Sequence, residues 1–333
     1  MQISPRVIVK SLLHGHRPRK AARYCPPGVD DLSRFLSYLE RKRLCDTSNA
    51  AAHTVFNNKL FFPATLGKWS GLAPRNIFFL QNGRCYDIRS DDWRIADPLD
   101  LMAEVGGRFV VKPLDSRKSR GVHFLSVLDG QVDVDGKPAC REQVLALALG
   151  RAGSIGCRFV EQHPDQSAIF PGVTHTLRMF TYHDELSGQG RVLRTVLRCG
   201  SASSAPFEAV SRGGMIAPVD QIAGTYGPLT QFVGKGTLGK VDRFTHVAHP
   251  DTGITVEGRR VPNWRIIRET MTELVTALPL FEFVGWDIVP TLDGFAILEA
   301  NDRPSMDTPQ YLAPLLDDQP FRDWMTRRGI LRR

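Results

Sequence analysis

The feature that most constrains the fold is a pair of short apolar runs near the C-terminal end of the chain. They lie in GWDIVPTLDGFAILEAND, residues 285–302, where the tetrapeptide TLDG separates them. Two strand-length apolar runs around such a turn predict an antiparallel hairpin. Asp287 interrupts the first run, and Glu299 and Asn301 end the second. Because strand side chains alternate between faces, Glu299 and Asn301 share a face, and pairing brings Asp287 towards them.

These three side chains all offer oxygen atoms. Two carboxylates with an amide oxygen suit Mg²⁺, a hard cation that usually shares its coordination shell with nucleotide phosphates and water. The same residues also suit solvent-facing or turn positions, so the stretch alone leaves both interpretations open.

Strands dominate the remaining pattern. Short apolar runs bounded by Gly, Pro or Asp predict strands at 76–80, 108–113, 122–127, 156–163, 174–184 and 191–200, the last two paired around ELSGQG. Helical spacing predicts helices at 30–44, with Asp30 as the cap, at 141–150 and at 263–278. The glycine-rich region 211–240 lacks periodicity and is predicted to be a loop with fragments of structure.

Composition narrows the class of protein. A chain of 333 residues that is 42% hydrophobic can bury a sizeable core and divides into two or three modules. No window is apolar enough to span a membrane, and the N-terminal sequence lacks the features of a signal peptide, so we expect a cytoplasmic protein. The six cysteines are scattered without a CxxC, which favours reduced thiols.

The formal charge of +8 has three interpretations. The basic residues are spread along the chain, which favours a solvated basic surface over an anionic or phosphorylated small-molecule substrate. Nucleic acid is the least favoured partner because the chain has no basic motif rich in aromatic residues.

Lys112 ends an apolar run and leads into a polar loop in RFVVKPLDSRKSRGV. A lysine at the end of a strand, followed by a loop rich in donors, suits phosphate oxygens. The GxxxxGK[ST] spacing of a P-loop is absent, and a plain exposed lysine is the alternative.

Three longer motifs resemble the sugar-transfer-associated family of ATP-grasp proteins. They are EQHPDQSAIFPGVTHTLRMFT, HPDTGITVEGRRVPNW and VGWDIVPTLDGFAILEAND, and the match covers roughly residues 57–304. The resemblance implies an α+β ATP-grasp fold, in which two α+β subdomains clasp ATP after a smaller N-terminal region. The implied parts are an N-terminal region at 1–100, a small subdomain with a phosphate flap at 101–160, and a large subdomain with the metal site at 161–333.

The resemblance also assigns the nucleotide-binding residues. Lys112 corresponds to the lysine that contacts the α and β phosphates, and Lys59 to an earlier lysine, although Asn58 replaces the usual aspartate. The flap would be residues 115–121, with Ser116, Ser119 and Gly121 as its phosphate-binding residues. Glu161 would hold the ribose, and Gln162 and His163 would complete the adenine hinge.

Asp287, Glu299 and Asn301 correspond to the family's metal-binding set, for Mg²⁺ or alternatively Mn²⁺. In related D-alanine ligases an arginine two residues before the aspartate steadies the acyl phosphate, whereas this chain has Gly285 there. Arg178 and Arg212 are therefore the candidate catalytic cations, together with Lys112. For Arg178 the alternative is a structural salt bridge, and for His175 we favour a buried structural histidine over a substrate contact.

The predicted function is that of a biosynthetic, ATP-dependent carboxylate–amine ligase, which acts through an acyl phosphate and releases ADP and phosphate. A phosphotransferase acting on a small molecule and a non-catalytic nucleotide-binding module are the alternatives. The expected partners are a small carboxylate and an amine, with a sugar or specialised-metabolite precursor as one source. No nucleic acid and no membrane span are expected, and the sequence does not predict the oligomeric state.

Overall fold

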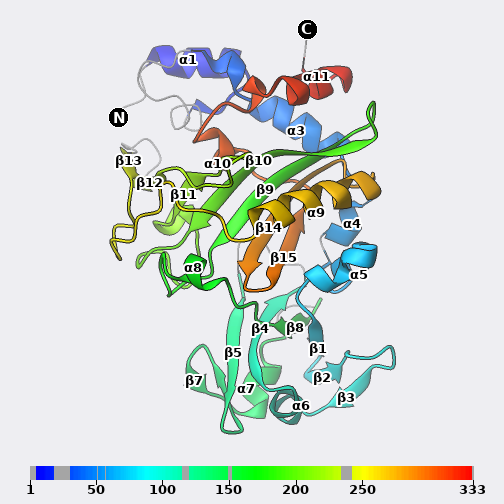
Figure 1. Ribbon diagram of the computed structural model, residues 1–333. Helices are drawn as coiled ribbons and strands as arrows, with labels where there is room; N and C mark the ends of the chain where they lie inside the picture. The colour runs from blue at the N-terminus through cyan, green and yellow to red at the C-terminus, as the bar shows by residue number, and fades with distance from the viewer. Residues whose placement is uncertain are drawn as a thin grey trace. The chain divides into compact units, whose positions relative to one another are not determined.

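The chain forms two compact units, each an antiparallel sheet with helices packed against it (Figure 1). The computed structural model describes residues 5–18, 31–50, 52–56, 58–114, 120–148, 152–233 and 242–331. The larger unit contains Met1–His53 and Gln162–Arg333, and the smaller unit contains Thr54–Glu161. The predicted α+β class is confirmed, and the three-part division of the chain stays a prediction.

The smaller unit is built on an eight-stranded sheet in the order β3-β2-β1-β8-β4-β5-β6-β7. Its strands are β1 (Asn76–Gln81), β2 (Arg84–Asp87), β3 (Arg94–Ala96), β4 (Gly107–Pro113), β5 (His123–Leu128), β6 (Gln131–Val134), β7 (Lys137–Pro138) and β8 (Ser154–Arg158). Helices α6 (Pro98–Val105) and α7 (Arg141–Leu145) contribute Met102 and Val144 to a core with Phe109 and Val111 of β4. Shorter helical segments are α4 (His53–Phe56), α5 (Phe62–Thr65) and η2 (Gly67–Leu72).

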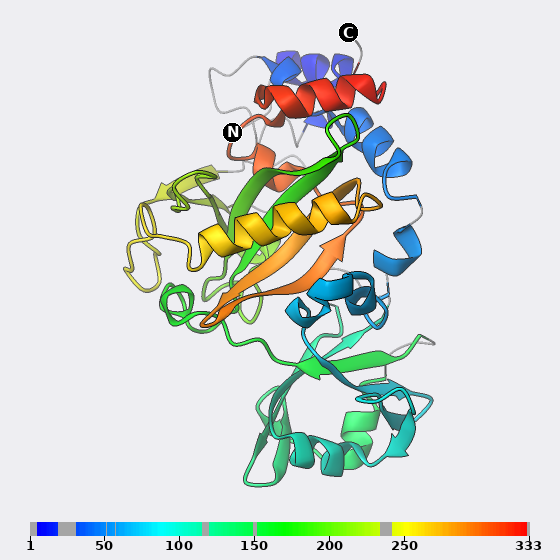
Figure 2. The ribbon, with the colours of Figure 1, turned by 45° about the vertical axis from the view of Figure 1, so that its right-hand side comes forward.

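The larger unit is built on a seven-stranded sheet in the order β13-β12-β11-β10-β9-β14-β15. Its strands are β9 (Thr176–Asp184), β10 (Gln189–Cys199), β11 (Met215–Pro218), β12 (Leu229–Val233), β13 (Asp242–His246), β14 (Phe283–Thr291) and β15 (Gly294–Asn301). Helix α9 (Trp264–Ala277) lies along one face, as Figure 2 shows. It packs so closely that a Cβ on Gly190 of β10 would lie 2.6 Å from the backbone nitrogen of Thr276.

Segments from both ends of the chain cover part of the opposite face. They are η1 (Leu32–Arg34), α3 (Tyr38–Thr47), α10 (Asp307–Gln310), η4 (Leu315–Asp317) and α11 (Gln319–Arg327), and α1 (Pro5–Leu13) precedes them. Phe321 and Trp324 of α11 form a buried core with Phe180, Tyr182 and Phe283 of the sheet. Alternation along β9 puts Arg178 on the same face as Phe180 and Tyr182, at the end that these aromatic residues do not occupy. We call this face the site face.

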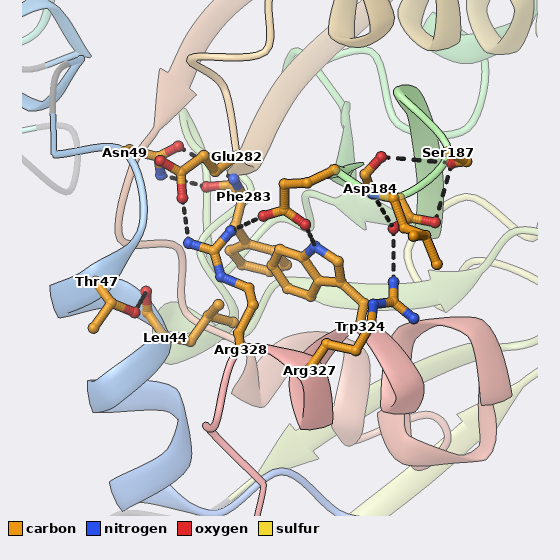
Figure 3. Close-up of polar contacts among 12 residues, drawn as sticks. Leu44, Thr47, Asn49, Asp184, Ser187, Glu282, Phe283, Trp324, Arg327 and Arg328 are labelled. Carbon is orange, nitrogen blue, oxygen red and sulfur yellow. Dashed lines mark hydrogen bonds and ion pairs between the residues drawn. The ribbon is translucent and has the colours of Figure 1, made fainter.

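Polar contacts fix α11 to the sheet, and Figure 3 shows this region. Arg328 forms ion pairs with Glu185 and Glu282, and Arg327 pairs with Asp184 at 2.6 Å. Asn49, from the N-terminal segment, donates its side-chain amide to the carbonyl of Phe283 at 2.6 Å. The start of β14 is therefore held by both ends of the chain.

The predicted helix at 30–44 is present only in part: α3 begins at Tyr38, and the short helix η1 lies before it. Ser37 caps α3 through a capping box with Glu40, and Phe35, between η1 and α3, is extended. The side chain of Gln310 accepts from the backbone N–H of Leu36 at 2.6 Å and donates to its carbonyl at 3.1 Å. Apolar spacing alone cannot reveal this long-range anchor, which stabilises an extended backbone here. Asp30, the predicted cap, lies outside the described residues.

The other predicted elements have clear counterparts. The helix at 263–278 is α9, the one at 141–150 is the shorter α7, and the six predicted strands correspond to β1, β4, β5, β8, β9 and β10. Residues 211–233 contain β11 and β12 joined by a loop, as expected, and 234–240 lie outside the described residues. The five cysteines in the described ranges are all free. No helix in the described ranges is both long and apolar enough to cross a membrane.

Candidate active site

A row of charged residues crosses three neighbouring strands on the site face. Asp287 of β14 lies directly opposite Arg178 of β9 on one side and Glu299 of β15 on the other. Gly285 pairs with Asn301 in the same hairpin. The predicted hairpin is therefore confirmed, and it places Asp287 beside Glu299, while their role in metal binding stays a prediction.

Asp287 is 8% exposed and is held by two guanidinium groups. The Nε of Arg178 donates to Oδ1 of Asp287 at 2.5 Å, and Nη2 of Arg178 donates to Oδ2 at 2.8 Å. Nη1 of Arg198 lies 3.3 and 3.4 Å from the same two oxygens. Burial alone would raise the pKa of Asp287, but Arg178 and Arg198 lower it below its usual value. The carboxylate is therefore ionised at neutral pH.

Arg198 is a functional candidate that the sequence analysis missed. It is opposite Thr176 in the β9–β10 pairing, and its Nη2 lies 3.0 Å from Oε1 of Glu208. Burial opposes its charge, but Glu208, Asp287 and Glu299 together raise its pKa. The sequence did contain a signal for it: an arginine near the end of an apolar strand. A charge that is buried there needs charged or polar partners.

Glu299 and Asn301 complete a set of oxygen donors around Asp287. Asn301 donates its amide nitrogen to the carbonyl of Gly285 at 3.3 Å, which leaves its Oδ1 as an acceptor. Within the described ranges no three His, Cys, Asp or Glu side chains are grouped to hold a metal ion. The amide oxygen would therefore have to join the two carboxylates, and this all-oxygen set suits Mg²⁺ once a guanidinium of Arg178 or Arg198 releases an oxygen of Asp287.

The packing around Gly285 explains why no arginine occupies that position. A Cβ there would lie 2.6 Å from Cβ of Pro304 and 3.6 Å from Cδ of Arg178. A side chain would have to displace Pro304, so the cation beside Asp287 comes from neighbouring strands. Arg178 is such a cation. Its bidentate salt bridge with Asp287 is compatible with both roles considered for it, a structural salt bridge and a catalytic cation.

Arg212 makes none of the contacts to Asp287 that Arg178 and Arg198 make. It ends the short helix η3 (Val210–Arg212), and its side chain is exposed. Gly213 follows with φ +103°, and a Cβ there would lie 2.1 Å from Oγ of Ser203. Its carbonyl accepts from Gln231 at 3.1 Å and from Ser201 at 3.0 Å. The backbone beside Arg212 is thus firmly held.

In the smaller unit, Lys59 lies against the end of the strand that carries Lys112. Lys112 is partly buried near the end of β4, and Nζ of Lys59 donates to the carbonyl of Leu114 at 3.3 Å. Asn58, in place of the family's aspartate, accepts from the backbone N–H of Leu60 at 3.0 Å. Both lysines therefore adjoin the point where the predicted flap begins. Ser116 and Ser119 lie outside the described residues, and Gly121 follows them with φ +67°.

The three predicted hinge residues already have protein partners. Glu161 is well exposed and pairs with Arg108 at 3.1 Å. The side chain of Gln162 donates to the carbonyl of Val173 at 2.8 Å and accepts from the N–H of His175 at 2.9 Å. Nδ1 of His163 accepts from the N–H of Asp165 at 3.1 Å and so caps α8 (Pro164–Ser167). The side chains of Gln162 and His163 hold their own segment, and the cofactor-binding role of all three residues stays a prediction.

His175 is fully buried, and its Nδ1 accepts from the N–H of Gly200 at 3.1 Å. Burial, with a smaller effect from His249, lowers its pKa to about 4. It is therefore neutral at physiological pH, which favours the structural interpretation.

Comparison with known proteins identifies the relatives of this chain. Residues 41–314 match the family model described as sugar-transfer associated ATP-grasp. No curated protein sequence matches the chain.

Among solved structures, the ATP-grasp ligase PsnB, complexed with a phosphomimetic variant of its minimal precursor, Mg and ADP, is 12% identical with a TM-score of 0.37. D-alanyl-alanine synthetase A from Vibrio cholerae is 13% identical with a TM-score of 0.42. Biotin carboxylase from Campylobacter jejuni is 8% identical with a TM-score of 0.41. The match with PsnB covers 81% of this chain and 60% of that chain. The match with the synthetase covers 85% and 66%, and the match with biotin carboxylase covers 79% and 45%, in the same order.

Proposed function

Because the chain belongs to the sugar-transfer associated ATP-grasp family, we propose that it is an ATP-dependent carboxylate–amine ligase. The observation that carries the proposal is the buried cluster of Arg178, Arg198 and Asp287 beside Glu299 and Asn301. It offers paired cations and oxygen ligands on one face of one sheet. This combination suits the transfer of a phosphoryl group, in which negative charge must be held and neutralised.

The proposed reaction has two steps. An oxygen of the substrate carboxylate attacks the γ-phosphorus of ATP, and the bond between that phosphorus and the β–γ bridging oxygen breaks, which releases ADP. The amine nitrogen then attacks the carbonyl carbon of the acyl phosphate, phosphate leaves, and the nitrogen loses a proton to form the amide. No side chain becomes covalently attached in either step, so positioning and charge are what the protein must supply.

Asp287, Glu299 and the Oδ1 of Asn301 would hold Mg²⁺, which supplies charge neutralisation on the phosphate oxygens. Arg178 and Arg198 keep Asp287 ionised and in place, and their guanidinium groups present positive charge on the same face. Paired guanidiniums suit the oxygens of a transferring phosphoryl group and of an acyl phosphate.

The nucleotide-binding assignments remain part of the proposal. Lys59 and Lys112 adjoin the end of β4 and would bind phosphate oxygens there. Ser116, Ser119 and Gly121 would belong to the flap. Glu161 would hold the ribose, in exchange for its present pairing with Arg108.

The substrates would be a small carboxylate and an amine. The family description connects the chain with sugar transfer, so a sugar precursor is one proposed source of either group.

A mass-spectrometric screen of carboxylates and amines with Mg·ATP tests the proposal. We expect ADP, phosphate and an amide only when carboxylate and amine are both present. AMP and pyrophosphate as products would contradict it. A stable phosphorylated substrate, other than an acyl phosphate, that accumulates without amine would instead indicate a phosphotransferase. Nucleotide binding without any ADP would indicate a non-catalytic module.

The control for the screen is Glu299→Ala, which removes one proposed metal ligand at a partly exposed position. We expect this variant to fold and to lose turnover. Full turnover by Glu299→Ala would show that the metal assignment is wrong.

A further inference from the structure

The site face continues beyond the charged row towards the outer strands of the sheet. Ile216 of β11 lies opposite Arg198 of β10 and also opposite Thr230 of β12. Two residues further along β12, Phe232 lies opposite Arg243 of β13. Directly opposed residues share a face of a sheet, and so do residues two apart in a strand. Arg243 is therefore on the same face as Arg198.

Helix η3 lies over this outer part of the site face. Its Val210 packs in a cluster with Val196, Ile216 and Phe232. Arg212, the last residue of the same short helix, is two residues from Val210 and so lies near this part of the sheet. The held carbonyl of Gly213 fixes the backbone from which the Arg212 side chain extends.

These two outer arginines differ from the two inner ones in their partners. Arg178 and Arg198 are paired with carboxylates of the protein. Arg212 and Arg243 are exposed, and neither side chain makes an ion pair or hydrogen bond with the rest of the described chain. Although Arg243 is exposed, partial desolvation of its guanidinium by neighbouring atoms lowers its pKa. Two cations that have no counterion among the described residues can bind an anionic group of a ligand.

We propose that Arg212, instead of steadying the acyl phosphate as the resemblance suggests, forms with Arg243 a subsite for a second anionic group of the substrate, remote from the carboxylate that is activated. This inference rests on the proposed ligase function and narrows its substrate class. Three interstrand spacings, roughly 14 Å in total, separate β10 from β13. The substrate would be a small molecule with a phosphate ester or a second carboxylate at the end distant from the reacting group.

Anion binding to the full-length protein tests the subsite. The protein is first saturated with Mg²⁺ and a non-hydrolysable ATP analogue, so that the nucleotide phosphates fill their own site. Inorganic phosphate is then titrated by calorimetry, and succinate is titrated in a parallel series. The variants are Arg212→Gln and Arg243→Gln. The matched control is Arg265→Gln, because Arg265 is an exposed arginine of α9 on the opposite face of the sheet.

We expect Arg212→Gln and Arg243→Gln each to weaken anion binding roughly tenfold or more, since each removes a charge-assisted contact. Arg265→Gln should bind like the wild type. All three variants should keep the wild-type unfolding temperature, because none of these side chains makes an ion pair or hydrogen bond with the described residues. Tighter binding of phosphate than of succinate identifies a phosphate ester, and the reverse order identifies a carboxylate.

The result that overturns the subsite is anion binding that Arg212→Gln and Arg243→Gln leave unchanged while the ATP analogue still binds. The proposed ligase function is tested separately in the same samples. If the analogue fails to bind the wild type although anion binding still depends on Arg212 and Arg243, the function is wrong and the subsite stands.

Discussion

At the scale of single residues, the site depends on a buried carboxylate between two guanidiniums. A buried ion pair costs desolvation energy, and removing one member strongly destabilises a protein because the other charge is left buried. Asp287 has two cationic partners, so the loss of either one leaves it partly compensated. This arrangement allows Arg178 and Arg198 to be tested one at a time.

Replacing Arg198 with Gln should lower kcat by about 100-fold or more, as expected when a donor to developing negative charge is removed. The protein should remain folded, because Arg178 still pairs with Asp287. Arg198→Lys should recover only part of the activity, since an ammonium cannot bridge Glu208 and Asp287 in the manner of a planar guanidinium. The check is steady-state kinetics on the substrate pair from the screen.

Arg265→Gln on α9 is the control for that series and should leave kcat unchanged. If Arg198→Gln were as active as this control, Arg198 would be a structural residue and the account of the two cations would be wrong.

His175 should make the stability of the protein depend on pH. Its pKa is lowered to about 4 in the folded protein, below the value of about 6.5 for an unfolded chain. The unfolded state therefore binds more protons between these values, and the free energy of unfolding falls as the pH drops through this window. The full loss is up to about 3 kcal/mol.

Urea unfolding at a series of pH values measures this effect as the difference between the wild type and His175→Asn. The asparagine retains an acceptor for the N–H of Gly200 but does not titrate, so its stability should fall less in acid. His14→Asn, at an exposed position, should follow the wild type. Parallel curves for the wild type and His175→Asn would contradict the assignment.

At the scale of elements, helix α11 supports the strands that carry the site. Trp324 is fully buried, packs against Tyr182 at 4.9 Å and Phe283 at 6.3 Å between ring centres, and donates to Glu185 at 2.9 Å. Phe283 is two residues before Gly285 on β14. Arg328 lies over the Trp324 ring at 5.0 Å and completes the contacts in Figure 3. The helix should therefore matter through its buried aromatic residues more than through its ion pairs.

Trp324→Ala should destabilise the protein by about 3–5 kcal/mol, the usual cost of truncating a buried aromatic residue. Arg327→Ala removes a pair with Asp184 at a partly exposed position and should cost about 1 kcal/mol or less. Chemical denaturation of both variants checks the comparison. Equal losses would show that the charged contacts, and not the core, hold the helix.

Across the whole chain, the sequence predicts those helices and strands that are determined by residues close together in the sequence. The β14–β15 hairpin and α9 are set by local patterns, and both are present. The pairing of Arg178 with Asp287 joins residues 109 positions apart, and strand order determines it. The bond between Leu36 and Gln310 spans 274 positions and holds the backbone between η1 and α3, where local spacing predicts a continuous helix. Such long-range pairing cannot be read from local patterns. This is why the sequence did not predict the role of Arg198 and why the predicted helix starts earlier than α3 does.

The candidate residues are also divided between the two units. Lys59, Lys112 and Glu161 belong to the smaller unit, and the metal-binding set with Arg178 and Arg198 belongs to the larger one. Membership of the ATP-grasp family is what connects them in one proposed reaction.

In the proposed reaction, the carboxylate substrate is activated by phosphorylation. The most direct measurement uses the substrate pair from the screen, with the carboxylate oxygens labelled with ¹⁸O, and analyses the released phosphate by mass spectrometry. An acyl phosphate pathway predicts that each phosphate formed carries one labelled oxygen, and that ADP is the nucleotide product. Unlabelled phosphate, or label in AMP, would contradict the account.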